Sequence, residues 1–264
     1  MAQERVISVI TPVHVGGDGF ILETFESLAS QKLPAGWSLE WVVQEDGRTG
    51  EPLRGVPDLP WVSKGNGRAG GAARARTVAL PRARGSLVRT LDADDLLPDA
   101  DVLARDIDVL LDRPGIGWCV SPCLDLLPDG ELKEGPNDPA PGLLPDGFLL
   151  DSLIEGELPV MGTTMTAHTA LVRAVGGWPA IPAFEDAATL LACEAVSSGW
   201  VQEQPGEIYR KHTSQSTASV EYHDPKEREL RVRASIERAL ALRDTGWRWT
   251  PAENWWQLVA RQAS

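Results

Sequence analysis

Short apolar runs alternate with amphipathic stretches along the first half of the chain. The apolar runs typical of strands cover residues 5–10, 39–44, 61–63 and 86–91. Stretches with apolar positions at helical spacing, or rich in Ala, lie between them and cover residues 20–31 and 72–80. Strands and helices in this alternation predict a parallel sheet with right-handed crossovers, so we expect an α/β fold.

The second half of the chain is less regular. An amphipathic helix is expected after Pro98, because apolar side chains recur there at Leu103, Ile107, Leu110 and Leu111. The further expected elements are a strand at 116–121, a helix at 187–198 and a charged helix at about 225–243. Residues 126–147 hold many Pro, Gly and Asp residues, which indicates either a long ordered loop or lid that shapes a pocket, or a plain surface excursion.

The charge of the chain argues against some classes of partner. The chain has 264 residues, of which 38 are acidic and 25 basic, and its net charge is −13. Nucleic acids and anionic membranes attract basic surfaces, so we expect neither as a partner. No apolar run approaches the roughly 20 residues of a membrane span, and the N-terminus lacks the basic start and apolar stretch of a signal peptide. We therefore expect a cytoplasmic protein.

The cysteines fit the same location. Cys119, Cys123 and Cys193 form no even set for a disulfide framework, which is typical of a reducing compartment. The first two have the spacing of a partial zinc clip, but no second pair or nearby His accompanies them. We expect all three to pack in the core.

Three carboxylates follow the predicted strand at 86–91. They belong to Asp92, Asp94 and Asp95. Carboxylate oxygens are hard ligands that suit Mg²⁺ or Mn²⁺, and such cations are usually shared with the phosphates of a substrate. Like charges this close repel one another unless a cation or an Arg compensates them. The pattern favours a divalent cation site, although Asp residues also open turns and cap helices.

Polar residues stand at the ends of three predicted strands, at Thr11, Asp46 and Asp92. Ligands of open parallel sheets gather at the carboxyl ends of the strands, so we expect the site there. The Gly-rich segment 16–19 lacks the Gly-x-Gly-x-x-Gly spacing, and the chain has no Gly-Lys-Ser/Thr phosphate loop. The chain therefore lacks the sequence signatures of the common dinucleotide and phosphate loops.

Several separated motifs point to one family. In chain order they are Val9-Ile10-Thr11-Pro12, Glu45-Asp46-Gly47, Gly71-Ala72-Ala73-Arg74-Ala75-Arg76-Thr77, Leu91-Asp92-Ala93-Asp94-Asp95, Gly176-Gly177-Trp178, Phe184-Glu185-Asp186 and Tyr209-Arg210-Lys211-His212. Through their order and spacing the chain resembles the inverting GT-A glycosyltransferases of family two, over roughly residues 5–217. It departs from the family pattern at His14 and Thr77, where Asn is usual.

The resemblance implies the fold and its division. We expect the GT-A fold, a Rossmann-like and mostly parallel sheet flanked by helices, with a C-terminal helical tail. Residues 1–112 would form the nucleotide-sugar-binding half of the domain and residues 113–220 its acceptor-binding half. The tail, residues 221–264, contains Trp247, Trp249, Trp255 and Trp256. Three roles are open for it: folding back over the acceptor site, a homodimer contact or contact with a membrane surface. The short segment and the acidic chain favour the first two.

The resemblance also implies how the donor is held. A divalent cation, Mn²⁺ or Mg²⁺, would bind the diphosphate through Asp94, with Asp92 and His212 as further ligands. Asp46 would accept the imide proton of a uracil or thymine base, and Arg76 would pair with the diphosphate or with the acid cluster. The remaining donor-binding positions are Thr11, Pro12 and Ala93. Plainer alternatives stay open: a turn-forming Asp46, a surface His212 and a solvated Arg76.

For catalysis, the family uses one carboxylate to take the proton of the acceptor hydroxyl. Asp186 matches this general base, with Glu185 as the neighbouring alternative, and inversion is implied by the resemblance alone. Both could instead be carboxylates at the N-terminus of the helix at 187–198, stabilised by its dipole. The positions that match the acceptor pocket are Thr163, Gly177 and Trp178. Core packing explains an indole there equally well.

The expected function is a metal-dependent inverting glycosyltransferase that moves a sugar from a UDP- or dTDP-sugar to a hydroxyl of a small molecule or glycan. Two alternatives stay open. A sugar-phosphate nucleotidyltransferase also uses carboxylates and Mg²⁺, but it would show a Gly-rich N-terminal motif where this chain has Pro12-Val13-His14. A catalytically silent nucleotide-sugar-binding module would explain the two departures from the family pattern. The intact acids weigh against it: Asp92, Asp94 and Asp186.

Overall fold

The structure is a computed structural model and describes residues 5–251 except 114, 136–137, 214 and 219, without the side chains of 216 and 221. In this part of the chain a sheet of eight strands has the order β3-β2-β1-β4-β9-β5-β10-β8. The strands are β1 (Arg5–Val13), β2 (Trp37–Glu45), β3 (Val62–Gly65), β4 (Leu87–Thr90), β5 (Ile116–Val120), β8 (Gly142–Leu143), β9 (Thr166–His168) and β10 (Ser198–Val201). Only the pairs that involve β8 or β9 are antiparallel. The expected mostly parallel sheet is confirmed.

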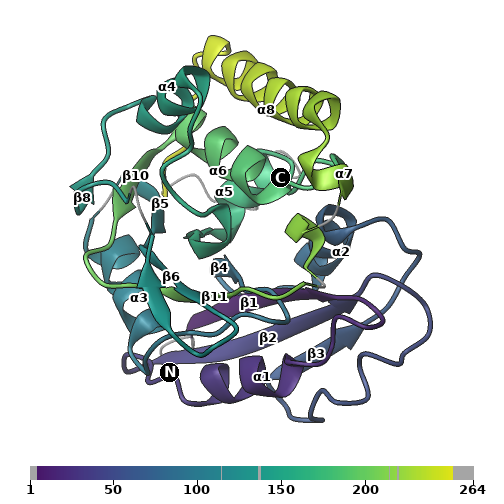
Figure 1. Cartoon of the computed structure of the whole chain (residues 1–264). Coiled ribbons are helices and arrows are strands. Elements are labelled where there is room, and N and C mark those ends of the chain that lie inside the picture. Colours follow the sequence, from purple (N-terminus) through teal and green to yellow (C-terminus); the bar gives the residue numbers. More distant parts are fainter. Residues whose placement is uncertain (1–4, 114, 136–137, 214, 219, 252–264) are drawn as a thin grey trace, which may run out of the picture.

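Helices cover both faces of this sheet (Figure 1). The helices of the described residues are α1 (Ile21–Ala29), α2 (Ala72–Ala79), α3 (Val102–Asp112), α4 (Phe148–Glu155), α5 (Thr169–Ala174), α6 (Glu185–Val196), α7 (Val220–His223) and α8 (Pro225–Asp244). Two buried clusters define the layers. Val9 shares one cluster with Ile21 of α1 and Leu103 of α3. The next residue, Ile10, points to the opposite face and shares the other cluster with Leu190 of α6. The strands therefore read as continuous apolar runs, because both of their faces are covered.

A second, three-stranded sheet has the order β11-β6-β7, formed by β11 (Glu207–Arg210), β6 (Cys123–Leu126) and β7 (Leu132–Glu134). Strand β11 also forms an antiparallel bridge between Ile208 and Leu96. Two backbone hydrogen bonds of 2.8 and 3.1 Å close this bridge. The bridge holds the segment before His212 against the loop that follows β4.

Strand β1 is longer than the sequence suggested. We expected it to stop before Thr11 and Pro12, but it continues to Val13, and Pro12 pairs with Gln44 of β2. Proline cannot donate to a ladder, yet it is tolerated where one side of the strand has no partner. This condition holds at Pro12, because β4 pairs with β1 only from Ile7 to Ile10.

Residues 126–147 are more structured than a long loop. They contain β7 and β8 and lead directly into α4. The strands β6 to β11 include several of only two to four residues. Such short strands show no alternating pattern of apolar and polar positions, which is why the sequence did not predict most of them.

The C-terminal segment packs on the domain. Figure 1 shows α8 lying across one end of the molecule, where it contacts α6 and α4. Asp224 caps α8 by accepting hydrogen bonds from the amides of Lys226 and Glu227, and Pro225 occupies the first turn. Trp249 is buried, and its amide donates to the carbonyl of Val196 at 2.8 Å. Trp255 and Trp256 lie outside the described residues.

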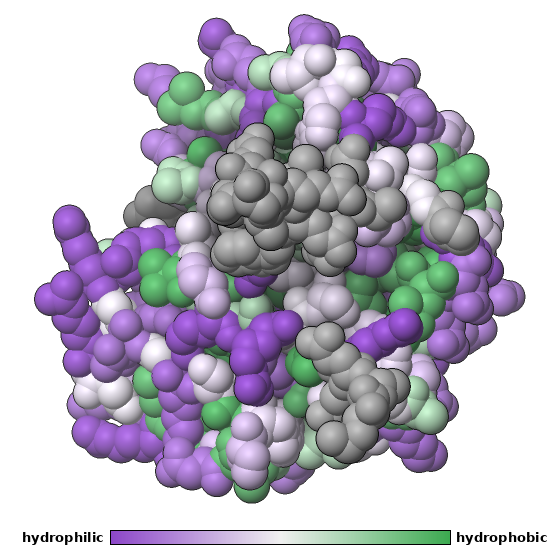
Figure 2. Space-filling model, turned by 180° about the vertical axis from the view of Figure 1, so that it is seen from behind, coloured by the Kyte–Doolittle hydropathy of each residue, from purple (hydrophilic) through white to green (hydrophobic). Residues whose placement is uncertain are grey.

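The surface is largely polar on the face that Figure 2 shows. On the face seen in Figure 2, hydrophilic side chains predominate and apolar side chains occur in small separate groups. Within the residues that the structure describes, no helix is both long and apolar enough to cross a membrane. Cys119, Cys123 and Cys193 are free and buried, which confirms their expected packing role.

Candidate functional site

The predicted site residues follow neighbouring parallel strands. Val13 at the end of β1 pairs with Glu45 at the end of β2, and Ile10 pairs with Thr90 at the end of β4. Asp46 and Asp92, which follow β2 and β4, therefore lie at the same edge of the sheet. This edge carries the carboxyl ends of the strands, where ligands of α/β sheets bind.

Asp46 holds the loop that leads into α2. Its Oδ1 accepts a hydrogen bond from the amide of Gly70 at 2.6 Å, and its Oδ2 accepts one from Gly71 at 2.8 Å. Gly71 has a φ of 88°, a conformation that a side chain would strain. A carboxylate offers about four lone-pair sites, so Asp46 retains capacity for a further donor. The neighbouring Glu45 is instead occupied by the turn at residues 49–50.

Arg76 joins the acid cluster to the residue next to the candidate base. Its side chain is 2% exposed and forms ion pairs with Asp92, after β4, and with Glu185, at the start of α6. Burial alone would lower the pKa of Arg76, but these two carboxylates raise it above its ordinary value. Arg76 is therefore a permanent buried cation at the centre of the site and not a solvated helix residue.

Glu185 and Asp186 differ in their surroundings. Burial raises the pKa of both carboxyl groups, and the opposing charge of Arg76 only partly offsets this effect. Glu185 pairs directly with Arg76, whereas Asp186 forms no ion pair with any described residue. Gly162 lies against Asp186, so closely that an added Cβ would come within 2.9 Å of Oδ2. Asp186 is thus the carboxylate with more freedom to accept a proton.

The backbone before these acids is strained. Ala183 and Phe184 have φ angles of 58° and 67°, in the left-handed region that residues with side chains rarely adopt. Each such residue costs on the order of 1–3 kcal/mol, and such strain concentrates at functional sites. The strain fixes the direction in which the chain enters α6, and therefore where Glu185 and Asp186 project.

Asp94 and His212 are in direct contact. His212 Nε2 lies 2.7 Å from Asp94 Oδ2, and the two side chains are 21% and 23% exposed. Burial and the neighbouring Asp92 raise the pKa of Asp94, whereas the contact with His212 lowers it. The contact places His212 in the acid cluster, which the sequence left open between a ligand and a surface residue.

Arg210 is a site residue to which sequence reasoning assigned no role. Its amide donates to Asp95 Oδ1 at 2.9 Å, its Nε donates to the carbonyl of Asp94 at 3.0 Å, and its Nη2 pairs with Glu23 at 2.6 Å. Asp95 is fully buried, and burial raises its pKa. Asp95 therefore anchors β11 beneath the cluster. The only signal for Arg210 in the sequence was its place in the motif that ends at His212.

Only some of the predicted metal ligands are placed where they could hold a divalent cation. In the described part of the chain, no group of three or more His, Cys, Asp or Glu side chains is arranged to hold a metal ion. Asp94 and His212 present a carboxylate oxygen and an imidazole nitrogen 2.7 Å apart, whereas Asp92 is held by Arg76. A cation that takes its other ligands from phosphates and water needs only one or two protein groups. The first two residues fit such a site.

Three predicted donor-binding positions are buried. The Thr11 hydroxyl is fully buried and accepts a hydrogen bond from Trp41 Nε1 at 2.9 Å. Pro12 is buried within β1. The carbonyl of Ala93 accepts a hydrogen bond from Thr24 at 3.0 Å. These positions are buried near the carboxyl ends of the strands, and the Thr11 side chain is not exposed at the protein surface.

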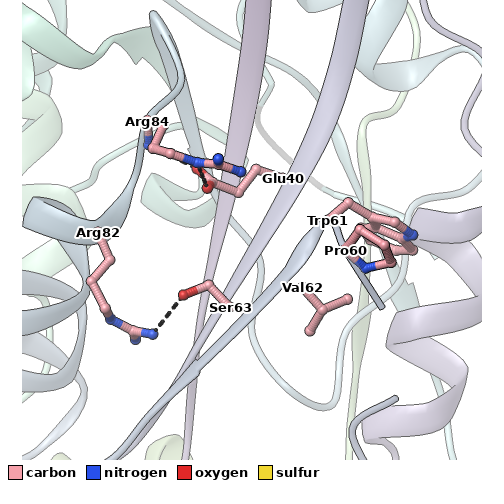
Figure 3. A pocket seen from close by; sticks show the side chains of 7 residues that line it. All are labelled: Glu40, Pro60, Trp61, Val62, Ser63, Arg82 and Arg84. Carbon is pink, nitrogen blue, oxygen red and sulfur yellow. Dashed lines mark hydrogen bonds and ion pairs between the residues drawn. The ribbon is translucent and has the colours of Figure 1, made fainter. Parts of the chain in front are cut away.

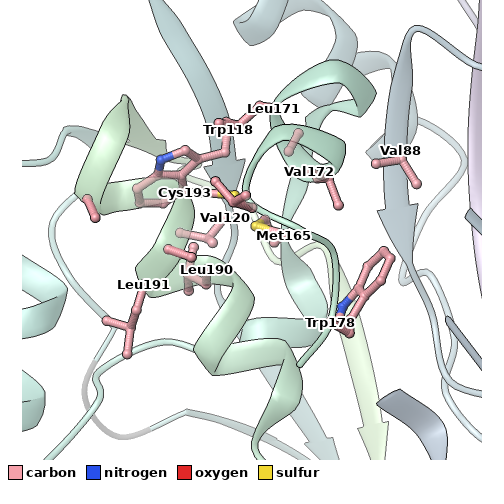
Figure 4. Packing of buried hydrophobic residues seen from close by; sticks show 14 of the residues in the cluster. Val88, Trp118, Val120, Met165, Leu171, Val172, Trp178, Leu190, Leu191 and Cys193 are labelled. Atoms are coloured by element: carbon pink, nitrogen blue, oxygen red, sulfur yellow. The ribbon is translucent and has the colours of Figure 1, made fainter. Parts of the chain in front are cut away.

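The three predicted acceptor residues are also engaged within the protein. The Thr163 hydroxyl donates to Glu207 at 2.6 Å. Trp178 is 4% exposed and belongs to the buried apolar cluster of which Figure 4 shows a part. The carbonyl of Gly177 accepts a hydrogen bond from Arg238 at 3.0 Å. An indole this buried offers no free face for a sugar, so the geometry favours core packing for Trp178.

A separate cavity of about 270 Å³ lies at the sheet edge formed by β3 (Figure 3). Its walls include Glu40, Trp61, Ser63, Arg82 and Arg84. Arg84 pairs with Glu40, and Arg82 donates to Ser63. None of the predicted site residues lines this cavity, so it is distinct from the candidate site.

Comparisons with known proteins connect this fold to nucleotide-sugar complexes. No protein-family model matches the chain, and no curated protein matches it. Residues 1–349 of S. aureus TarS in complex with UDP match with a TM-score of 0.67 and 20% identity, over 88% of this chain and 64% of that chain. The complex with UDP-GlcNAc matches with a TM-score of 0.67 and 22% identity, over 88% and 66%. A further structure of S. aureus TarS matches with a TM-score of 0.58 and 21% identity, over 78% of this chain and 37% of that chain.

These comparisons bear on the fold. The chain spans less than two thirds of the length of the TarS chains that it matches. At this sequence identity the likeness shows a shared fold, and it confirms the expected α/β architecture with a mostly parallel sheet and flanking helices.

Proposed function

We propose that this chain is a glycosyltransferase that takes its sugar from a UDP- or dTDP-sugar and transfers it to a hydroxyl of a small molecule or glycan. The observation that carries the proposal is the buried Arg76, which joins Asp92 of the acid cluster to Glu185 beside the candidate base. It connects two segments that a donor and an acceptor must both reach. The TarS structures of the same fold, which hold UDP and UDP-GlcNAc, support a nucleotide sugar as the donor.

The donor would lie along the carboxyl ends of β1, β2 and β4. Asp46, held at the end of β2, would accept the imide proton of a uracil or thymine base. Asp94 and His212 would hold Mn²⁺ or Mg²⁺, which supplies positive charge to the diphosphate. Arg76 adds a second, permanent positive charge nearby, and its two ion pairs fix its orientation before the donor arrives.

The proposed chemical step is a direct displacement that inverts the anomeric carbon. The acceptor oxygen forms a bond to this carbon while the bond from the carbon to the diphosphate oxygen breaks. Asp186 takes the hydroxyl proton, and the electron pair of the broken bond leaves with the diphosphate. The raised pKa of Asp186 suits a proton acceptor, because a carboxylate that binds protons more tightly is a stronger base. No covalent enzyme intermediate is required.

A thermal-shift measurement tests the donor class. The protein is heated with UDP, dTDP, GDP or ADP, each with and without Mn²⁺, since a ligand that binds only the native state raises the melting temperature. We expect UDP or dTDP to raise it, and only when Mn²⁺ is present. A shift for no nucleotide would contradict the proposal, and a shift for GDP or ADP alone would contradict the role of Asp46. Release of UDP from the bound sugar donor then separates an enzyme from a silent binding module.

A further inference from the structure

A cavity beside Phe184, the residue before α6, is not explained by donor binding. It has a volume of about 290 Å³ and lies between the end of α4, the residue before α6, and the segment formed by α7 and the start of α8. The strained Phe184 forms part of its wall. Phe184 directly precedes Glu185 and Asp186 in the chain, so the cavity reaches the segment that carries the carboxylate we assign as the base.

Two arginines of α8 line this cavity. Arg228 and Arg231 are three residues apart, so they lie on the same face of the helix. Arg231 is only 5% exposed, donates a hydrogen bond to the carbonyl of Tyr222 at 2.5 Å, and lies 4.4 Å from the centre of that ring. It forms no ion pair with a described residue. A guanidinium has five N–H donors, and among the described residues Arg231 uses one of its Nη2 donors, for Tyr222.

The charge of the cavity is opposite to that of the chain. Among its lining residues, Arg228 and Arg231 face a single carboxylate, Glu157, and His223 adds a group that can become positive. The chain as a whole has a net charge of −13. Burying a cation without a carboxylate partner costs free energy unless an anion compensates it. The cavity therefore has the chemistry of an anion-binding site with one apolar wall.

We propose that this cavity binds an anionic group, a phosphate or a carboxylate, of the acceptor molecule. The inference rests on the proposed function, because it assigns to the acceptor a cavity whose wall includes Phe184, two positions before Asp186. The planar guanidinium of Arg231 matches the paired oxygens of either group, and Arg228 supplies a second charge at the cavity mouth. Leu158, Phe184 and Val232 would contact the less polar part of the same molecule. In this arrangement α8 contributes to acceptor selection as well as to packing.

Calorimetric titration of small anions into the protein saturated with UDP and Mn²⁺ tests the inference. The probes are phenyl phosphate, benzoate and the neutral benzamide. We expect at least one of the two anions to bind and benzamide to bind at least tenfold more weakly, as loss of a charged hydrogen bond requires. Phenyl phosphate as the better probe would indicate a phosphorylated acceptor, and benzoate a carboxylated one. Equal binding of benzamide, or no binding of either anion, would overturn the inference.

Three variants locate the binding site. Arg228→Gln removes an exposed charge, and Arg231→Lys keeps the charge but not the planar donor geometry, so neither leaves a buried carboxylate unpaired. Each should weaken anion binding about tenfold. Arg233→Gln is the matched control, because Arg233 is on the same helix, pairs with Glu237 on the surface and does not line the cavity. Equal anion binding by all three variants and the original protein would overturn the inference.

UDP binding is measured separately in the same variants. UDP binding without anion binding would overturn the inference and leave the proposed function standing. Anion binding that depends on Arg228 and Arg231, without any UDP binding, would support the anion site and contradict the donor assignment.

Discussion

His212 Nε2 lies 2.7 Å from Asp94 Oδ2, although 118 positions separate the two residues in the chain. Strand β11 holds the segment before His212 in position for this contact. Its Ile208 bridges to Leu96, and the Arg210 side chain donates to the carbonyl of Asp94. A residue near the end of the domain is thereby fixed beside the loop after β4. The pair places a carboxylate and an imidazole side by side, which is a tertiary feature and not a local motif.

The Asp94–His212 pair should act as a unit in metal-dependent binding. Asp94→Ala and His212→Ala should each weaken Mn²⁺-dependent binding of UDP by about 10- to 100-fold, because each removes a predicted ligand. The double variant should lose less than the sum of the two free energies, since both groups serve one cation. Calorimetry with and without Mn²⁺ measures this. Asp108→Asn, an exposed acid on α3, is the control. Additive losses, or unchanged heats for Asp94→Ala, would exclude the assignment.

Substitutions of Asp186 and of Glu185 should have different kinetic effects. Asp186→Asn should retain donor binding and lose about 10² to 10⁴ of the turnover rate, because the variant cannot take the acceptor proton. Glu185→Gln, in contrast, should weaken donor binding, since it disturbs the position of Arg76. The measurement is the rate of UDP release from the sugar donor together with its affinity. Near-normal turnover in Asp186→Asn would move the base to another residue.

Arg76 should contribute strongly to stability. Arg76→Gln leaves the partly buried Asp92 and the buried Glu185 without their cation, and breaking a buried ion pair typically costs about 3–5 kcal/mol. Arg74→Gln is the matched control, because Arg74 is on the same helix and forms no ion pair with a described residue. Urea denaturation gives the free energy of unfolding of each variant. A loss below about 1 kcal/mol for Arg76→Gln would show that the two carboxylates find other partners.

Glu194 should make stability depend on pH. Its carboxylate caps α4 by accepting hydrogen bonds from the amides of Leu149 and Leu150 at 2.7 and 2.9 Å. Burial nevertheless raises its pKa from 4.5 to about 7. The native state therefore holds this proton at pH values where the unfolded chain has lost it. The resulting stabilisation is complete below the unfolded pKa and is lost as the pH rises to about 7.

Glu194→Gln isolates this effect, because the amide stays neutral. The difference in unfolding free energy between the variant and the original protein should shift in favour of the variant by on the order of 2 kcal/mol between pH 5 and pH 8. Urea denaturation at both pH values measures it. An equal difference at the two values would show that Glu194 titrates near its ordinary pKa.

Much of the first half of the fold follows from periodicity. Strands β1, β2 and β4 are long enough or apolar enough to be recognised, and their ends place Asp46 and Asp92 at one edge. Contacts between distant segments could not be predicted in the same way. The contact of Arg76 with Glu185 joins α2 to α6, and no local pattern encodes it. The motif order indicated that these segments belong to one site, and packing decides which groups meet.

For the expected acceptor-binding region, the sequence was less informative about which side chains are buried. Trp178 stands in a motif where a sugar could stack, but its side chain is buried in the apolar core. Arg231 lies in a charged helix for which the sequence left several roles open, and α8 packs on α6 and buries this side chain. Which face of a charged helix is covered depends on tertiary packing. The cavity beside Phe184 therefore could not be predicted from the sequence.

A crystal structure of the protein with UDP and Mn²⁺, using the anomalous signal of manganese to place the cation, tests the central claim most directly. The account predicts the uracil base beside Asp46, the diphosphate beside Arg76, and manganese in contact with the Asp94 carboxylate and the His212 imidazole. UDP bound elsewhere, for example in the cavity between Trp61 and Arg82, or manganese away from Asp94, would contradict the account.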